Sequence, residues 1–484
     1  MNKKFFAALA SATMAFTASG SIAVFADDFV EENTPVVNPG DIQQNPTKFA
    51  FNKDNFGALV DGKVTFTGDS GVVTLTKNEE YEASKFAEVK KITFASDFKG
   101  EIKGLEYFTE LTSFDDSAIT TGKIKNETLD FSANTKLDTL TVKKAGDLAE
   151  IVLPEPSLNE KEEEVYSLAT LDLEGTKLAA LDLSAQERLV ANGSVTVKGN
   201  HNLKEVTLKT VTSAKPAKLA KLDLSDNALE TVDLGNYTID TLDLSKNHIG
   251  ALNLTKTTVN TTATLNEQTF YVYEKAANVN LKDAFAELDV DYVKADSKAF
   301  NSETGVLDLA KAKEYEYVTS LKGKATNKRL EVKLVAANPM NRLYNPNSGE
   351  HFYTADVKEK EALVNLGWND EGYGWVAPTT PAKVTTTSDQ PVYRLYNPNA
   401  GDHHYTMSKE ERNTLVAYGW KDENVGWYSA EDASHNDETV TVWRQYNPYA
   451  NGAGSHNYTT DRAENNYLVS LGWIYEGKAW KALR

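Results

Sequence analysis

Apolar and polar residues alternate in short runs between residues 105 and 262, and turn-forming residues separate the runs. The clearest run reads LDLSDN at 222–227 and returns as LDLSKN at 242–247, so that the full period is 20 residues. Each run fits a short strand whose two leucines point inward, and the asparagine after it can bind backbone groups where the chain turns. One coil alone buries too little apolar surface. The pattern therefore predicts a solenoid of stacked coils with a parallel β-sheet.

A longer unit is repeated three times between residue 340 and the C-terminus. Each copy contains Arg-x-Tyr-Asn-Pro, His-x-Tyr-Thr, Gly-Trp and a second tryptophan, and the intervals between His351, His403 and His456 are 52 and 53 residues. The Asn-Pro turn predicts a strand pair, and a capping residue three positions before a glutamate predicts a short helix that ends at Gly-Trp. The expected capping pairs are Asp356 with Glu359, Ser408 with Glu411, and Asp461 with Glu464.

A second strand pair is expected at the end of each copy. Its tight turn falls on residue types that tolerate positive φ, namely Gly372, Asn424 and Gly477. The expected buried face of each helix carries a leucine, at Leu363, Leu415 and Leu468. The three copies are predicted to close about a pseudo-threefold axis, as a trefoil-like or propeller-like module with one short helix per repeat.

The predicted fold class is mixed and mainly β. Alternating runs at 270–273 and 330–335 predict a small β domain between the two repetitive regions. The predicted organisation is a signal peptide at 1–26, a linker at 27–50, a solenoid N-terminal cap at 51–104, the solenoid at 105–262, the small β domain at 263–337 and the triple-repeat module at 338–484.

The first residues are typical of a secretory signal peptide. Lys3 and Lys4 precede an apolar stretch over 5–25, and Ala26 marks the expected cleavage site. An uncleaved membrane anchor is the alternative. The chain has no cysteine, and export without disulfides fits a bacterial surface better than an animal secretory route. We expect a protein that is secreted or noncovalently associated with the cell surface, without membrane insertion after cleavage.

Composition and charge limit the classes of partner. Hydrophobic residues make up 40% of the chain and charged residues 25%, as in ordinary soluble globular proteins. The 70 acidic residues outnumber the 51 basic ones and give a formal net charge of −19. Nucleic acids and anionic membranes bind through cationic side chains, so neither is an expected partner.

The side chains repeated in the module are its candidate ligand-binding residues. Catalysis needs one asymmetric site, whereas these residues recur in every copy. Three interpretations remain open: buried histidines that tie each hairpin to its helix, a ligand pocket in each copy, or catalysis or metal binding. The candidate residues are Arg342, His351, Tyr353 and Trp368 in copy one, Arg394, His403, Tyr405 and Trp420 in copy two, and Arg444, His456, Tyr458 and Trp473 in copy three.

Other repeated residues are expected to have structural roles. The second tryptophan of each copy is expected in the core or at its rim, at Trp375, Trp427 and Trp480. Each repeated arginine is expected to pair with an acidic residue of its own copy, at Glu371, Glu423 or Glu476.

On the solenoid, Asp223 and Asp243 lie one period apart and are expected to form an exposed column. This column is either a solvated acidic face or a surface for a cation-bearing partner. The sequence contains no zinc-protease, serine-hydrolase or phosphate-loop motif. It therefore predicts no catalytic residue, no metal and no cofactor.

Two parts of the chain resemble known families. Residues 50–262, most strongly 219–254, resemble the leucine-rich repeats of secreted and surface proteins of Gram-positive bacteria, including internalin-like ones. The segment at 104–114 is similar to the one that opens such arrays. The motifs at 340–484 resemble modules of uncharacterised function in exported proteins of bacteria and fungi, which are sometimes attached to hydrolases.

These expectations combine into an exported, adhesin-like binding protein that is not an enzyme. The solenoid would recognise a host or bacterial surface protein. The module would bind a glycan or a cell-envelope polymer, and its repeated weak sites would raise avidity. The alternatives are a protein associated with glycan or peptidoglycan hydrolysis and a structural envelope protein without a ligand.

Overall fold

The structure is a computed structural model in which strands make up 43% of the chain and helices 12%, which confirms a mainly β fold. It describes residues 48–483 except 160, 212–216, 274–275, 287, 320–321, 324–327, 379–389, 431–438 and 451. The predicted signal peptide and nearly all of the predicted linker lie outside the described residues. Within the described part, no helix is long and apolar enough to cross a membrane.

An aromatic cluster fills the N-terminal cap. Phe56 stacks on Phe86 with ring centroids 5.1 Å apart, and Phe66 stacks on Phe108 at 5.5 Å. Strand β2 pairs antiparallel with β5, the first strand of the solenoid sheet, and so covers an edge that would otherwise be exposed. The cap consists of β1 (Lys48–Ala50), α1 (Lys53–Phe56), β2 (Val64–Gly68), β3 (Gly71–Val72), β4 (Glu80–Glu82) and α2 (Ala83–Ala87).

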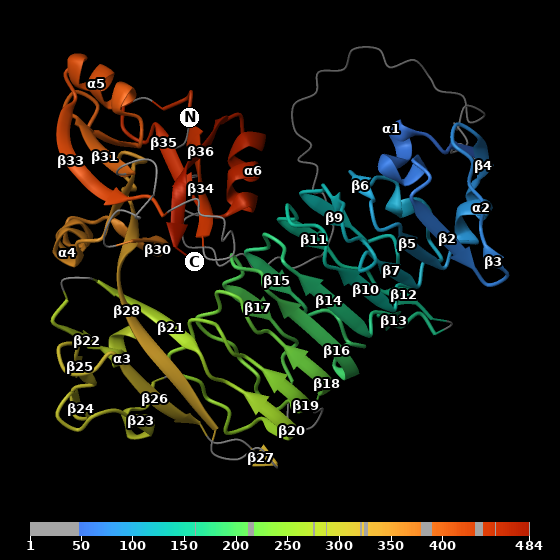
Figure 1. Cartoon of the computed structure of the whole chain (residues 1–484), viewed down its shortest axis with the longest axis horizontal. Helices are drawn as coiled ribbons and strands as arrows, with labels where there is room; N and C mark the ends of the chain where they lie inside the picture. Colours follow the sequence, from blue (N-terminus) through green and yellow to red (C-terminus); the bar gives the residue numbers. More distant parts are fainter. Residues whose placement is uncertain are drawn as a thin grey trace, which may run out of the picture.

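The predicted solenoid is present and has about seven turns. Its long strands pair in parallel, each with the equivalent strand of the next coil, from the cap to the small β domain (Figure 1). The inward-facing apolar residues of these strands, such as Leu140, Leu171 and Leu242, form one continuous core, as the alternation predicts. The strands are β5 (Lys91–Phe94), β7 (Ser113–Asp115), β10 (Thr139–Val142), β14 (Thr170–Glu174), β16 (Ala191–Lys198), β18 (Lys218–Asp223), β19 (Thr238–Asp243) and β20 (Thr258–Thr264).

Away from the main sheet, shorter strands of different coils also pair with one another. Three parallel pairs are β6 (Lys99–Gly100) with β8 (Lys123–Ile124), β9 (Thr128–Asp130) with β11 (Glu150–Val152), and β15 (Ala180–Asp182) with β17 (Glu205–Thr207). A hairpin of β12 (Ser157–Leu158) and β13 (Glu164–Val165) extends from one coil.

Asparagines join successive coils at the turns, as predicted. The Nδ2 group of Asn247 donates to the carbonyl of Leu244 in its own coil (3.1 Å) and to that of Leu224 in the preceding coil (2.9 Å). Asn227 donates to the carbonyl of Leu224 at 2.8 Å. In the last coil, Gln268 replaces the asparagine and donates to the carbonyl of Leu244 at 2.8 Å. These bonds satisfy buried carbonyl groups that have no strand partner.

The predicted aspartate column exists, but it is less exposed than predicted. Asp223 and Asp243 are direct partners in the register of β18 and β19. Their carboxylates turn back to bind the hydroxyl groups of Ser225 and Ser245, each at 2.6 Å. Asp223 is only 8% exposed as a result. The Asp-x-Ser pattern thus stabilises the turn after each strand.

One long strand connects the small β domain to the C-terminal module. β28 (Lys328–Tyr344) pairs with β21 (Gln268–Tyr273) and β26 (Glu314–Thr319) in its first part, and with two strands of the first repeat in its last part. It therefore crosses the boundary predicted at 337/338 without a linker. The other elements are β22 (Asn278–Asn280), α3 (Leu281–Ala284), β23 (Val293–Lys294), β24 (Phe300–Asn301), β25 (Val306–Asp308) and β27 (Lys322–Gly323).

Each copy of the module has three antiparallel strands and one helix, as Figure 1 shows in orange and red. The strands of copies one and three belong to one nine-stranded sheet with strands of the small β domain, whereas those of copy two form a separate three-stranded sheet. Copy one adds β29 (His351–Thr354), α4 (Val357–Asn365) and β30 (Asn369–Ala377) to β28. Copy two has β31 (Pro391–Asn397), β32 (Asp402–Thr406), α5 (Lys409–Ala417) and β33 (Lys421–Tyr428). Copy three has β34 (Thr439–Tyr446), β35 (His456–Thr459), α6 (Arg462–Ser470) and β36 (Ile474–Leu483). The trefoil-like or propeller-like closure stays a prediction.

The last strand of each copy differs from the predicted hairpin. Gly372, Asn424 and Gly477 have φ values of +77°, +71° and +95°, as expected for these residue types. They lie inside β30, β33 and β36, where the register with the first strand shifts. The positive φ therefore produces a bulge within one long strand instead of a turn between two.

Candidate functional site

The tyrosines of the three His-x-Tyr-Thr motifs meet at the centre of the module. The backbone N–H of Tyr353 donates to Oη of Tyr405 (3.2 Å), that of Tyr405 to Oη of Tyr458 (3.1 Å), and that of Tyr458 to Oη of Tyr353 (3.1 Å). This closed cycle relates the three copies by a pseudo-threefold axis. All three side chains are at most 1% exposed, and burial raises the pKa of each phenol. Although predicted as ligand-binding residues, they lie in the core.

The second tryptophans form the next layer of this core, as predicted. Trp375, Trp427 and Trp480 are 4%, 3% and 4% exposed. Their ring centroids form a triangle with sides of 5.7, 5.4 and 5.5 Å. Among the described residues, none accepts a hydrogen bond from their three indole N–H groups.

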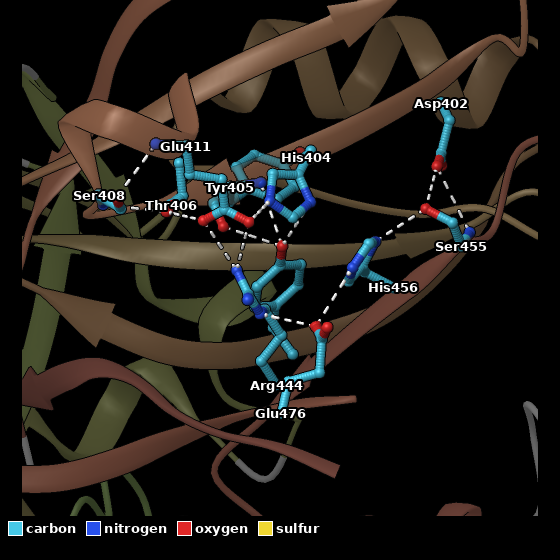
Figure 2. A network of polar contacts seen from close by, with 11 residues as sticks. Asp402, His404, Tyr405, Thr406, Ser408, Glu411, Arg444, Ser455, His456 and Glu476 are labelled. Carbon is cyan, nitrogen blue, oxygen red and sulfur yellow. Dashed lines mark hydrogen bonds and ion pairs between the residues drawn. The ribbon is translucent and has the colours of Figure 1, made fainter. Parts of the chain in front are cut away.

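Each repeated arginine joins two copies of the module. Arg444 lies 2.9 Å from Glu476 of its own copy and 3.1 Å from Glu411, which lies on α5 of the preceding copy (Figure 2). The equivalent pairs are Arg342 with Glu371 (2.8 Å) and Glu464 (2.7 Å), and Arg394 with Glu423 (2.8 Å) and Glu359 (3.0 Å). The pairs within one copy confirm the prediction. The pairs between copies form a closed ring of ion pairs around the axis.

The glutamates that pair between copies are Glu359, Glu411 and Glu464, and the sequence predicts that they belong to capping boxes. The predicted N-caps are present, because Asp356, Ser408 and Asp461 each accept a hydrogen bond from a backbone N–H in the first turn of their helix. The glutamates three positions later turn to the neighbouring arginine instead of the N-cap. A charged guanidinium is the stronger partner for a carboxylate.

The three histidines occupy equivalent, half-buried positions. The Nε2 atom of each lies near the glutamate of its own copy, at 3.4 Å for His351 and Glu371, 3.6 Å for His403 and Glu423, and 3.3 Å for His456 and Glu476. The Nδ1 atoms differ: that of His403 lies 2.6 Å from Glu350 of copy one, whereas that of His456 lies 2.8 Å from Ser455 (Figure 2). Within the described residues, no cluster of such side chains is arranged to hold a metal ion.

Burial and the neighbouring charges together set the pKa values of the side chains in this network. Burial alone would raise the pKa of Glu464, but the attraction and hydrogen bonds of Arg342 lower it from its ordinary value of 4.5 to about 2. Burial and the charge of Arg342 lower the pKa of His351, so this imidazole is neutral at pH 7. Burial raises the pKa of Glu350. The network is therefore a set of fixed charge pairs in which each charge has a partner.

The depressed pKa of Glu464 predicts acid destabilisation of the module. A carboxylate whose pKa is lower in the folded state contributes stability above its unfolded pKa and loses it as the pH falls towards the folded value. We expect the stability to fall between pH 4.5 and about pH 2, by on the order of 3 kcal/mol for this group. All seven tryptophans lie in the module, so tryptophan fluorescence, excited selectively over that of tyrosine, reports the unfolding of the module in the full chain. In the variant Glu464→Gln this dependence should be weaker, and an unchanged profile would contradict the assignment.

A surface feature that the sequence does not reveal lies at the C-terminal end of each helix. Leu366, Tyr418 and Leu471 occupy equivalent positions and are 76%, 78% and 53% exposed. Two positions earlier, each copy has a valine that is 38–40% exposed, at Val364, Val416 and Val469. Two positions later, each has a partly exposed tryptophan, at Trp368, Trp420 and Trp473. The valine, the leucine or tyrosine, and the tryptophan of one copy together form one repeat patch, so that the module has three repeat patches.

The predicted ligand-binding residues thus divide into three groups. The tyrosines lie in the core, the arginines and histidines belong to the ion-pair network, and Trp368, Trp420 and Trp473 lie at the surface in the repeat patches. The leucines predicted on the buried helix faces, Leu363, Leu415 and Leu468, are only half-buried. The repeat patches are the candidate binding site of the module.

A comparison with known protein families finds a match over the C-terminal module. Residues 339–483 match a family described as a domain of unknown function (DUF5648). No curated protein matches the chain. A solved structure of a Listeria monocytogenes internalin-like protein matches with 11% identity and a TM-score of 0.17, over 53% of this chain and 90% of that chain. The evidence for the repeat architecture of this chain is the parallel pairing of its successive strands.

Proposed function

We propose that this chain is an exported, adhesin-like binding protein whose C-terminal module binds a glycan or a cell-envelope polymer without turnover. The repeat patches are the proposed contact surfaces. The solenoid is the proposed recognition surface for a host or bacterial surface protein, because stacked repeats present extended surfaces of this kind. The protein acts outside the cell, either secreted or held noncovalently at the cell surface.

The observation that supports this proposal is the threefold exposure of large apolar side chains at equivalent positions. A leucine or tyrosine that is more than half exposed contributes little to folding, and here it recurs in all three copies. A tryptophan lies two positions away in each patch, and flat aromatic rings stack on sugar rings. Three equivalent patches on one rigid module would bind a repetitive polymer with avidity, although each contact is weak.

Co-sedimentation of the full chain with insoluble peptidoglycan, chitin and cellulose tests the proposal. We expect at least one polymer to bind the chain. Replacing one patch tryptophan should weaken binding moderately, and the triple variant Trp368→Ala, Trp420→Ala and Trp473→Ala should weaken it by more than about a hundredfold. No reducing ends should be released in either case.

A matched control separates the patches from exposed apolar residues in general. Leu158 on the solenoid is 67% exposed, so Leu158→Ala removes an exposed apolar side chain outside the module and should leave binding unchanged. Circular dichroism melts verify that the triple variant is folded. Binding that survives in a folded triple variant would contradict the role of the patches, and released reducing ends would contradict binding without turnover.

A further inference from the structure

The third repeat differs from the other two where it contacts the solenoid. Trp443 is the one tryptophan outside the repeated positions, and its equivalents are Asn341 and Tyr393. The guanidinium of Arg462 lies 4.4 Å from the centroid of the Trp443 ring and forms an ion pair of 2.8 Å with Glu127 of the solenoid.

A second contact strengthens this junction. Asn466, one turn further along α6, donates to the other carboxylate oxygen of Glu127 at 3.1 Å. The ring of Tyr475 lies 5.2 Å from the Arg462 guanidinium, on the module side. The cation is thus held by two aromatic rings and one carboxylate, which is stronger than an isolated surface ion pair. We call Glu127, Arg462 and Trp443 the clasp.

A cleft of about 570 Å³ lies where the solenoid, the small β domain and the module meet. The solenoid contributes Lys204 and Glu230, β21 contributes Phe270, and the module contributes Tyr373 and Trp375. The Nζ atom of Lys204 also donates to the backbone carbonyl of Tyr373 at 3.5 Å, which connects two walls of the cleft. The volume lies within the range of small-molecule sites, which occur preferentially at domain interfaces.

The chemistry of the cleft walls indicates the class of ligand. Two lysines, Lys204 and Lys360, are balanced by two carboxylates, Glu230 and Asp283, so the lining carries no formal net charge in a chain whose net charge is −19. A charged ligand would find no excess of opposite charge there. The lysines can donate hydrogen bonds to hydroxyl groups, and the carboxylates can accept hydrogen bonds from them.

Aromatic side chains supply the other half of the recognition surface. Phe270, Phe285, Tyr373 and Trp375 line the cleft. Tyr373 is 47% exposed, whereas Phe285 and Trp375 are only 8% and 4% exposed. Flat apolar rings beside polar groups of both types suit a sugar chain, which has apolar faces and hydroxyl edges.

We propose that this cleft is a binding site for a neutral oligosaccharide, built jointly by the solenoid, the small β domain and the module, and that the clasp, which joins the solenoid to the module, keeps its walls in position. The site is separate from the repeat patches and is supported by independent observations. It binds one short chain in a defined pocket, whereas the patches are proposed to contact a long polymer.

Isothermal titration of the full chain with maltohexaose, cellohexaose and chitohexaose tests the proposal. We expect one of these neutral hexasaccharides to bind, and Tyr373→Ala to weaken its binding at least about tenfold. Val425 occupies the equivalent position in copy two and does not line the cleft, so Val425→Ala is the matched control and should change affinity less than about twofold.

Two further variants make the outcome decisive. Arg462→Glu should weaken binding by opening the clasp, and Arg462→Lys, which keeps a cation beside Trp443 and Glu127, should weaken it less. The triple tryptophan variant of the repeat patches should bind the hexasaccharide normally. The proposal is overturned if no hexasaccharide binds, if Tyr373→Ala and Val425→Ala have equal effects, or if the triple variant loses the binding. Loss in the triple variant would assign the binding to the patches.

Discussion

Replacing Trp427 with alanine should lower the free energy of unfolding of the C-terminal module by about 4 kcal/mol. The indole is only 3% exposed and packs against both other tryptophans of its layer and against Tyr405, whose ring centroid is 5.1 Å away. These neighbours belong to a closed threefold arrangement and cannot collapse into the space without breaking it. The cost therefore includes a residual cavity in addition to the lost apolar burial.

Copy two also provides the matched control for this prediction. Trp420 has the same side chain seven positions earlier but is partly exposed, so Trp420→Ala should cost only about 1 kcal/mol. Urea unfolding of the full chain, followed by tryptophan fluorescence, measures both values for the module. Equal losses for the two variants would refute the division into core tryptophans and patch tryptophans. That division is the basis of the proposed binding surface.

Periodic features of this chain could be predicted from the sequence because their causes are local. The 20-residue interval between Leu222 and Leu242 reappears as the direct register between those two residues in neighbouring strands. Asn247 binds backbone carbonyls at the turn, as its position after the strand implies. The helices of the module begin at the predicted N-caps. In each case a residue type and its sequence neighbours determine the structure.

Features that depend on contacts between copies could not be predicted. Glu411 has the sequence position of a capping-box residue, and only the placement of copy three beside copy two reveals Arg444 as its partner. The sequence predicts a core or rim position for Trp375, Trp427 and Trp480, but not that the three rings meet in one triangle between the copies. The continuous strand β28 could not be predicted either, because two adjacent alternating runs also fit two separate strands.

The ring of ion pairs should dominate the coupling between copies, so we expect Arg444→Met to destabilise the module by about 3 kcal/mol. Methionine fills most of the space of the arginine side chain. The loss therefore comes from leaving Glu411 and Glu476 without their shared cation in a half-buried site. The attraction of His404 and Arg444, together with hydrogen bonds, holds the pKa of Glu411 below its ordinary value despite burial. Without Arg444, Glu411 should titrate at a higher pH.

Arg412 provides a control on the same module, because it pairs with Asp422 of its own copy and so does not join two copies. Arg412→Met should cost less than Arg444→Met, on the order of 1 kcal/mol, because it leaves one carboxylate without its cation instead of two. A double-mutant cycle of Arg444→Met with Glu411→Gln should give a coupling energy of about 1–3 kcal/mol in urea unfolding followed by tryptophan fluorescence. Coupling near zero would mean that burial at the axis, rather than the ion pairs, holds the three copies together. A large coupling at all three arginines would show that the copies close their ring through charge pairs.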